Sequence, residues 1–132
     1  MTRRILIPVT AVVAALALSA CGTENVETSD IEPQYQAGAD LFVENCSGCH
    51  TLSSVGAEGS AIKINNRERV DGPNFDQRAE TKDQVLYAIR NGGFSGAIMP
   101  ENIVTGPEAQ ELAAFLAKYA GADKPAAVSP TG

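Results

Sequence analysis

The sequence predicts an all-α fold of three main helices joined by long loops. Apolar residues recur at the spacing of one helix face over residues 34–45, 82–91 and 106–119. Residues 51–71 have no such pattern and no convincing strand signal, so we expect a loop there. Helices this short would make a small core, which often needs a staple such as a bound cofactor.

The second and third predicted helices have recognisable first turns. Thr81 with Gln84, and Thr105 with Glu108, have the spacing of a capping box. Pro107 suits the first turn of the third helix. The apolar face of that helix is one stripe: Leu112, Phe115, Leu116 and Tyr119.

The 132 residues are expected to hold one domain. Residues 1–20 combine two arginines, an apolar run and small residues before Cys21, and resemble a lipoprotein signal peptide that is cleaved at a lipidated cysteine. An ordinary signal peptide with a stray cysteine is the alternative. Residues 21–33 would then be a lipidated acidic tether, residues 34–120 the domain, and residues 121–132 a disordered tail.

This organisation predicts an exported protein, lipid-anchored on the outer face of the cytoplasmic membrane, on the periplasmic or extracytoplasmic side. The apolar run at residues 5–18 is shorter than the about 20 residues that a membrane-spanning helix needs. The formal net charge of −6 disfavours binding to nucleic acid.

Cys46, Cys49 and His50 form a Cys-x-x-Cys-His motif, which is typical of covalent haem c attachment. Two thiols one helical turn apart can add to the two vinyl groups of a porphyrin, and the adjacent histidine then reaches the iron. A thioredoxin-like redox pair would need a βαβ context, and structural zinc would need four ligands. Cys21 is the only other cysteine and His50 the only histidine. We therefore expect one covalent haem c with His50 as an axial iron ligand.

Met99 is the expected second axial ligand. Apart from Met1 it is the only methionine, and it lies between a glycine-rich stretch, residues 92–96, and Pro100. A loop methionine is otherwise a filler of irregular gaps. Ligation by methionine and histidine raises the reduction potential and leaves no open iron position. Ligation of the iron by both His50 and Met99 therefore predicts an electron-transfer protein with no catalytic residues, rather than an enzyme.

Five segments follow one another in a recognisable order: Gly38-Ala39-Asp40-Leu41-Phe42, Cys46-x-x-Cys49-His50, Gly72-Pro73-Asn74-Phe75, Met99-Pro100 and Leu112-Ala113-Ala114-Phe115-Leu116. Their order and spacing resemble the class I mono-haem cytochromes c, in a bacterial lipoprotein form, over about residues 34–120. That resemblance implies a cytochrome c fold, with three main helices and long loops wrapped around the haem. It also implies that Gly38 and Phe42 pack against the last helix, and that the carbonyl of Pro73 accepts a hydrogen bond from His50.

The resemblance implies a membrane-anchored carrier of single electrons that cycles between Fe(III) and Fe(II) in a respiratory or similar chain. Its partners would be a quinol–cytochrome c oxidoreductase and a terminal oxidase, or a periplasmic dehydrogenase as donor. A haem enzyme with an open iron position, a haem sensor and a fixed subunit of a respiratory complex are the alternatives. Twenty-two residues separate His50 from Pro73, more than in the shortest members of the family. We expect the extra loop, which contains Lys63, Arg67 and Arg69, to cover one haem edge.

Overall fold

The computed structural model describes residues 26–61, 63–94 and 98–122. The expected signal peptide (residues 1–20), the expected lipid site at Cys21, and nearly all of the expected tail lie outside these ranges. Within them, no helix is both long and apolar enough to cross a membrane.

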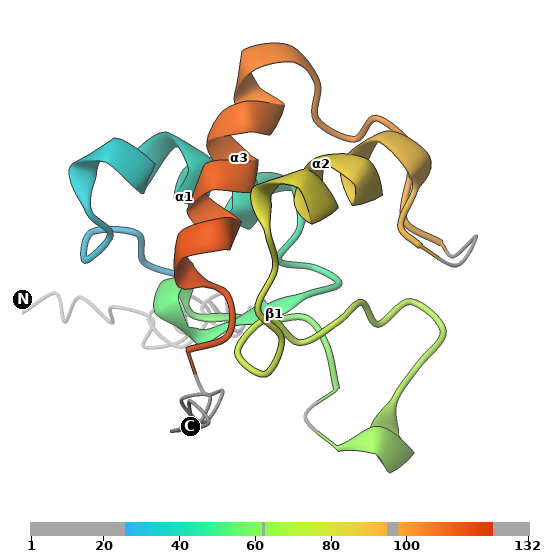
Figure 1. The fold of residues 1–132 in the computed structure, drawn as a ribbon. Coiled ribbons are helices and arrows are strands. Elements are labelled where there is room, and N and C mark those ends of the chain that lie inside the picture. Colours follow the sequence, from blue (N-terminus) through green and yellow to red (C-terminus); the bar gives the residue numbers. More distant parts are fainter. Residues whose placement is uncertain (1–25, 62, 95–97, 123–132) are drawn as a thin grey trace, which may run out of the picture.

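Three α-helices form the framework of the described chain (Figure 1), as predicted: α1 (Gln36–Asn45), α2 (Lys82–Asn91) and α3 (Gly106–Tyr119). α3 packs against both α1 and α2. A short 3-10 helix, η3 (Pro33–Tyr35), precedes α1, so the first α-helix begins two residues later than residue 34. The bounds of α2 and α3 are those that the sequence predicts.

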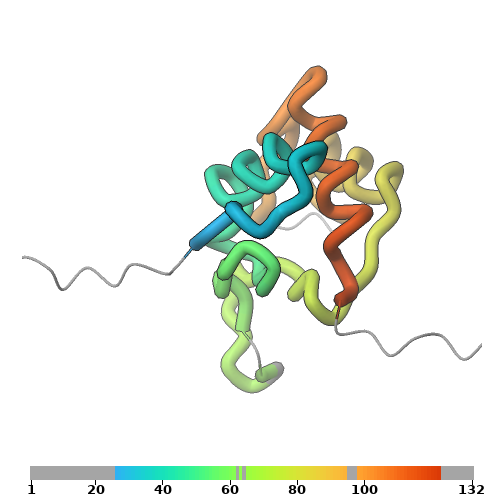
Figure 2. The backbone as a smooth tube through the Cα atoms, turned by 90° about the vertical axis from the view of Figure 1, so that its left-hand side faces the viewer, coloured from blue at the N-terminus to red at the C-terminus, as the bar shows by residue number. Residues whose placement is uncertain are grey.

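The predicted loop after His50 contains two short strands, so the fold is not purely helical. β1 (Thr51–Leu52) and β2 (Ala57–Glu58) pair antiparallel, with Leu52 opposite Ala57. The 3-10 helix η4 (Ser53–Val55) and Gly56, whose φ is 69°, connect them. The expectation of a strand-free loop was wrong because strands of two residues are too short to show an alternating pattern. A further 3-10 helix, η5 (Ile64–Asn66), lies within residues 63–71. These residues, called the projecting segment below, extend from the body of the molecule in both views (Figures 1 and 2).

A glycine determines how closely α1 and α3 approach. A Cβ atom on Gly38 would overlap the carbonyl oxygen of Glu111 and lie 2.6 Å from the Cβ of Phe115. The ring of Phe42, one turn further along α1, lies 6.0 Å from the ring of Phe115. The expected contact of Gly38 and Phe42 with the last helix is therefore confirmed.

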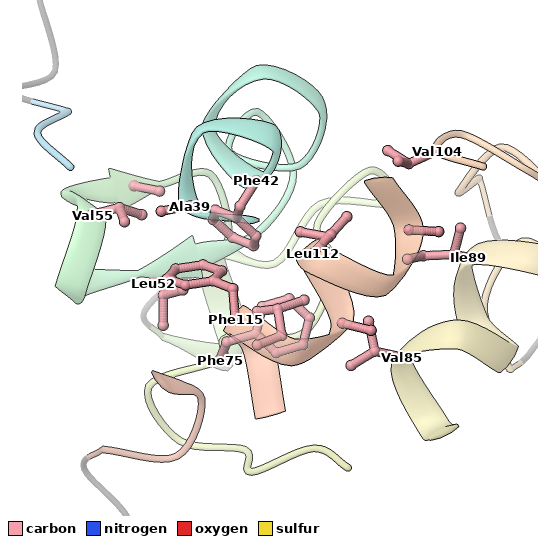
Figure 3. Close-up of a cluster of buried hydrophobic side chains, with 14 of the residues drawn as sticks. Ala39, Phe42, Leu52, Val55, Phe75, Val85, Ile89, Val104, Leu112 and Phe115 are labelled. Carbon is pink, nitrogen blue, oxygen red and sulfur yellow. The ribbon is translucent and has the colours of Figure 1, made fainter. Parts of the chain in front are cut away.

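The core lies between the three helices and the small hairpin (Figure 3). Its largest fully buried side chains are Phe42, Phe115, Leu52, Leu112 and Val55. They come from α1, α3 and the hairpin region, so the hairpin closes the side of the core that the helices leave open.

One of the two predicted capping boxes is present. At the start of α2, the Thr81 hydroxyl accepts a bond from the Gln84 N–H at 3.2 Å, and the Gln84 side chain accepts one from the Thr81 N–H at 2.8 Å. At the start of α3, Thr105 makes no capping bond. That prediction was wrong because Gly106, the first residue of α3, has a φ of 63°. This left-handed conformation differs from the helical one that the residue after the cap has in a capping box.

The contacts of the domain include residues that precede its expected boundary at residue 34. Ile31 is buried, and the Glu32 N–H donates to the Tyr119 hydroxyl at 3.0 Å. Gly121, the first residue of the expected tail, donates its N–H to the carbonyl of Phe75 at 2.6 Å. The last residues of the expected tether thus contact the domain, and the tether and the tail themselves stay predictions.

Candidate haem site

The Cys-x-x-Cys-His motif directly follows α1 and continues its winding. The Cys46 N–H donates to the Phe42 carbonyl at 2.8 Å, so Cys46 caps the helix. The N–H groups of Cys49 and His50 then both donate to the carbonyl of Cys46, at 3.1 and 3.0 Å. This turn brings the three side chains to the wall of one pocket.

The pocket encloses about 290 Å³ and is lined by Cys46, Cys49, His50 and Met99, the four residues that the sequence predicts to hold the haem. Arg67 and Arg69, from the projecting segment, also line it. Its inner walls are apolar side chains of α2 and α3: Val85, Ala88, Ile89, Leu112 and Leu116.

The ring of His50 is held by residues 72–75, which follow the projecting segment. Its Nδ1 atom lies 3.0 Å from the carbonyl oxygen of Pro73, at the place expected for Pro73. The ring of Phe75 stacks on the imidazole, with centroids 4.8 Å apart and planes 13° apart. A Cβ on Gly72 would lie 2.5 Å from Nδ1 and 2.6 Å from Nε2. Nearly equal distances to both nitrogens place that Cβ over the ring face, so only a glycine allows this approach.

Gly72 and Phe75 are site residues to which the sequence had assigned no role. Both belong to the Gly72-Pro73-Asn74-Phe75 segment that carries the family resemblance. The resemblance indicated the Pro73 contact with His50, but the sequence reveals neither the approach of Gly72 to the ring nor the stacking of Phe75 on it, because both depend on the path of the loop between them.

The protonation states of the site follow from burial. Burial lowers the pKa of His50, and the bond to Pro73 opposes this shift only in part, so the imidazole is neutral at neutral pH. Because the Pro73 carbonyl can only accept, Nδ1 carries the proton and Nε2 keeps a free lone pair, as a metal ligand requires. Burial and the neighbouring Cys49 raise the pKa of the Cys46 thiol to about 12, so this thiol keeps its proton.

The donor set fits a haem c better than a bare metal ion. Cys46 and Cys49 are free thiols, and Met99 is half-buried against the apolar core. Among the described residues, no group of three or more His, Cys, Asp or Glu side chains has the arrangement of a metal-ion site. Two thiols, an imidazole and a thioether around an apolar pocket suit a porphyrin.

The basic residues near the site fall into two groups. Arg67, Arg69 and Arg78 line the pocket, whereas Lys63 lies at a separate shallow depression on the projecting segment. Arg78 pairs with Glu80, whose side chain is only 6% exposed, and its guanidinium lies 5.9 Å from the centre of the Phe94 ring.

Comparison with known proteins agrees with this chemistry. No curated protein shows significant similarity to the chain. Residues 33–116, well over half of the chain, match the sequence model of a family described as cytochrome c oxidase, cbb3-type, subunit III. The matched range contains the attachment motif, Pro73 and Met99. The chain therefore belongs to this family of class I c-type cytochrome domains, as its resemblance to the mono-haem cytochromes predicts.

Proposed function

We propose that the protein is a mono-haem c-type cytochrome that carries single electrons between respiratory redox partners while anchored to the membrane. The family implies a haem-based electron-transfer protein. The observation that carries the finer proposal is the convergence of two free thiols, a neutral imidazole and one thioether on a single apolar pocket.

Each site residue has a defined part in this proposal. When bound, the haem supplies an iron that changes between Fe(III) and Fe(II). Cys46 and Cys49 would hold the porphyrin covalently, and His50 and Met99 would ligate its iron. The Pro73 carbonyl holds the imidazole in one tautomer and orientation. The apolar side chains of α2 and α3 would exclude water from the bound group, which supports a high reduction potential.

The rim of the pocket suits transient docking of a redox partner. Three exposed apolar side chains of the described chain, Val70, Phe94 and Ile98, line the pocket. A fourth, Tyr87, stacks on Phe94 with ring centroids 5.1 Å apart. Clustered exposed apolar groups of this kind are typical of interaction surfaces.

For partners, the proposal includes a quinol–cytochrome c oxidoreductase and a terminal oxidase, or a periplasmic dehydrogenase as donor. The family description, which names a subunit of an oxidase, favours a second candidate function, that of a fixed subunit in a respiratory complex. Purification from mild detergent separates the two: a stoichiometric complex supports the fixed subunit, and a monomer supports the mobile carrier.

For location, we propose export and lipid anchoring at Cys21, outside the cytoplasmic membrane. The signal-like residues 1–20 support this proposal. Radiolabelled fatty acid should be incorporated into the wild type, and the Cys21→Ser variant should take up none and leave the membrane fraction. Equal labelling of both proteins would exclude Cys21 as the lipid site.

An optical spectrum of the mature protein tests the electron-carrier proposal. In the oxidised protein, the far-red sulfur-to-iron band should be present, and in the reduced protein carbon monoxide should leave the spectrum unchanged. A missing band with immediate carbon monoxide binding would mean an open iron position, and would favour catalysis or sensing. A mature protein without covalent haem would refute the proposal.

A further inference from the structure

The C-terminal end of α2 is a left-handed turn made by two glycines. Gly92 has a φ of 66° and donates its N–H to the carbonyl of Ala88. Gly93 has a φ of 87°, and its N–H also donates to Ala88, at 2.8 Å. Glycine is the residue that ends helices in this conformation at least cost. Because Gly93 turns back to Ala88, the carbonyl of Ile89 has no partner within the helix.

The segment that carries Met99 (residues 98–104) supplies that partner. The Asn102 N–H donates to the Ile89 carbonyl at 2.7 Å. Asn102 is the only non-glycine residue with a positive φ, 55°, in the described part of the chain. The last turn of α2 and the Met99 segment are thus joined by a backbone hydrogen bond.

A second contact lies at Met99 itself. A Cβ atom on Gly92 would lie 2.7 Å from the carbonyl oxygen of Met99 and 3.1 Å from the Cγ of Glu101. Side-chain carbons do not approach backbone oxygens that closely, so any other residue at position 92 has to displace Met99. The backbone of Met99 therefore rests directly on the helix end.

We propose that Gly92 is a positioning residue for Met99: the bare backbone of the α2 C-terminus supports the carbonyl of Met99 and so holds its thioether over the pocket. This inference rests on the proposed ligation of the iron by Met99. The Asn102–Ile89 bond fixes the same segment three residues later. The backbone of the segment is therefore held against the end of α2 at both Met99 and Asn102.

Another left-handed glycine offers a matched control. Gly92→Ala and Gly106→Ala both put an alanine into a left-handed backbone, with φ values of 66° and 63°, which disfavours each to a similar extent. Only the methyl of Gly92→Ala meets Met99, because Gly106 begins α3 away from the pocket lining and a Cβ on it would have no described atom within 4 Å. A difference between the two variants thus reports the contact with Met99 and not the backbone strain.

The test compares the holoproteins by the far-red band and by carbon monoxide titration. Gly92→Ala should lose most of the band and bind carbon monoxide with an affinity about tenfold higher, because the form with Met99 off the iron becomes more populated. Gly106→Ala should keep the wild-type band and affinity. A wild-type spectrum for Gly92→Ala, or the same loss in Gly106→Ala, would overturn the inference.

A second variant covers the case in which Gly92→Ala does not fold. Asparagine tolerates the left-handed conformation better than alanine but still carries a Cβ, so Gly92→Asn should show the same loss of the band. An intact band in folded Gly92→Asn would refute the inference. A wild-type protein without the band would instead refute ligation by Met99, and with it the proposed function, before any variant is compared.

Discussion

The Nδ1 atom of His50 and the carbonyl oxygen of Pro73 lie 3.0 Å apart, although the two residues are 23 positions apart in the chain. A backbone bond holds the two segments together, since the Gly72 N–H donates to the carbonyl of Cys49 at 2.7 Å. The orientation of the histidine is therefore set by backbone groups of residues 72 and 73, which side-chain substitution does not remove. It can, however, be disturbed by added volume.

Gly72→Ala should disturb the orientation of the His50 ring. The new methyl would lie within about 2.6 Å of both ring nitrogens of His50, so the ring or the 72–73 backbone has to move and the bond to Pro73 should weaken. A weaker bond makes the imidazole a poorer electron donor, and we expect the reduction potential of the holoprotein to rise. Overpacking should also lower the free energy of unfolding by roughly 1–3 kcal/mol.

A redox titration of the purified holoprotein measures this shift. Gly48→Ala is the control, because its Cβ would meet no described atom within 4 Å although it lies inside the attachment motif. An unchanged potential in Gly72→Ala would show that the contact with the ring does not tune the site.

The helices were predictable because their signals are local. The apolar stripe of α3 and the capping box of Thr81 with Gln84 lie within the elements that they define. The glycine at position 38 was predictable only through the family resemblance, because its partner lies on α3, far along the chain.

The features that the sequence did not reveal are too short for a periodic pattern, depend on how distant segments meet, or depend on the backbone conformation of a single residue. The β1–β2 hairpin is too short for a periodic pattern, and its Thr51 also pairs with Asn74 after the projecting segment. The packing of Gly72 and Phe75 on His50 likewise needs the path of that segment. Thr105 has the sequence of a capping box, but the left-handed Gly106 that follows it removes the required geometry.

Gly38→Ala should weaken the crossing of α1 and α3. The added methyl would overlap the Glu111 carbonyl and lie 2.6 Å from the Cβ of Phe115. Overpacking of roughly 1–3 kcal/mol should exceed the gain in helix propensity of about 1 kcal/mol, so the holoprotein should unfold at lower denaturant. Glu44→Ala, at an exposed position of the same helix, should change the free energy of unfolding by less than about 0.5 kcal/mol. A Gly38→Ala variant as stable as the wild type would mean that the helices can separate without cost.

The two N-cap threonines should differ in their contributions to stability. Thr81→Ala removes the side chain that accepts the bond from Gln84 and should lower the free energy of unfolding by about 1 kcal/mol. Thr105→Ala removes an exposed side chain that makes no capping bond, and we expect a change of less than about 0.5 kcal/mol. Urea unfolding of both holoproteins, followed by circular dichroism, makes the comparison. Equal losses would mean that Thr105 caps α3 in solution.

The buried carboxylate of Asp76 should stabilise the hairpin region against the segment that holds His50. Asp76 is 6% exposed and accepts bonds from the N–H and the hydroxyl of Ser53, at 2.7 and 2.6 Å. Asp76→Asn replaces one accepting oxygen by a donor, so it should lower the free energy of unfolding by about 1.5–3 kcal/mol, as for other hydrogen bonds to charged groups. Ser53→Ala removes the hydroxyl bond alone and should cost less.

Since both substitutions disrupt the same Asp76–Ser53 hydrogen bond, the double variant should be more stable than the sum of the two single losses predicts. Strictly additive losses in denaturant unfolding would show that the two side chains stabilise the fold independently, and that the bond between them contributes nothing measurable.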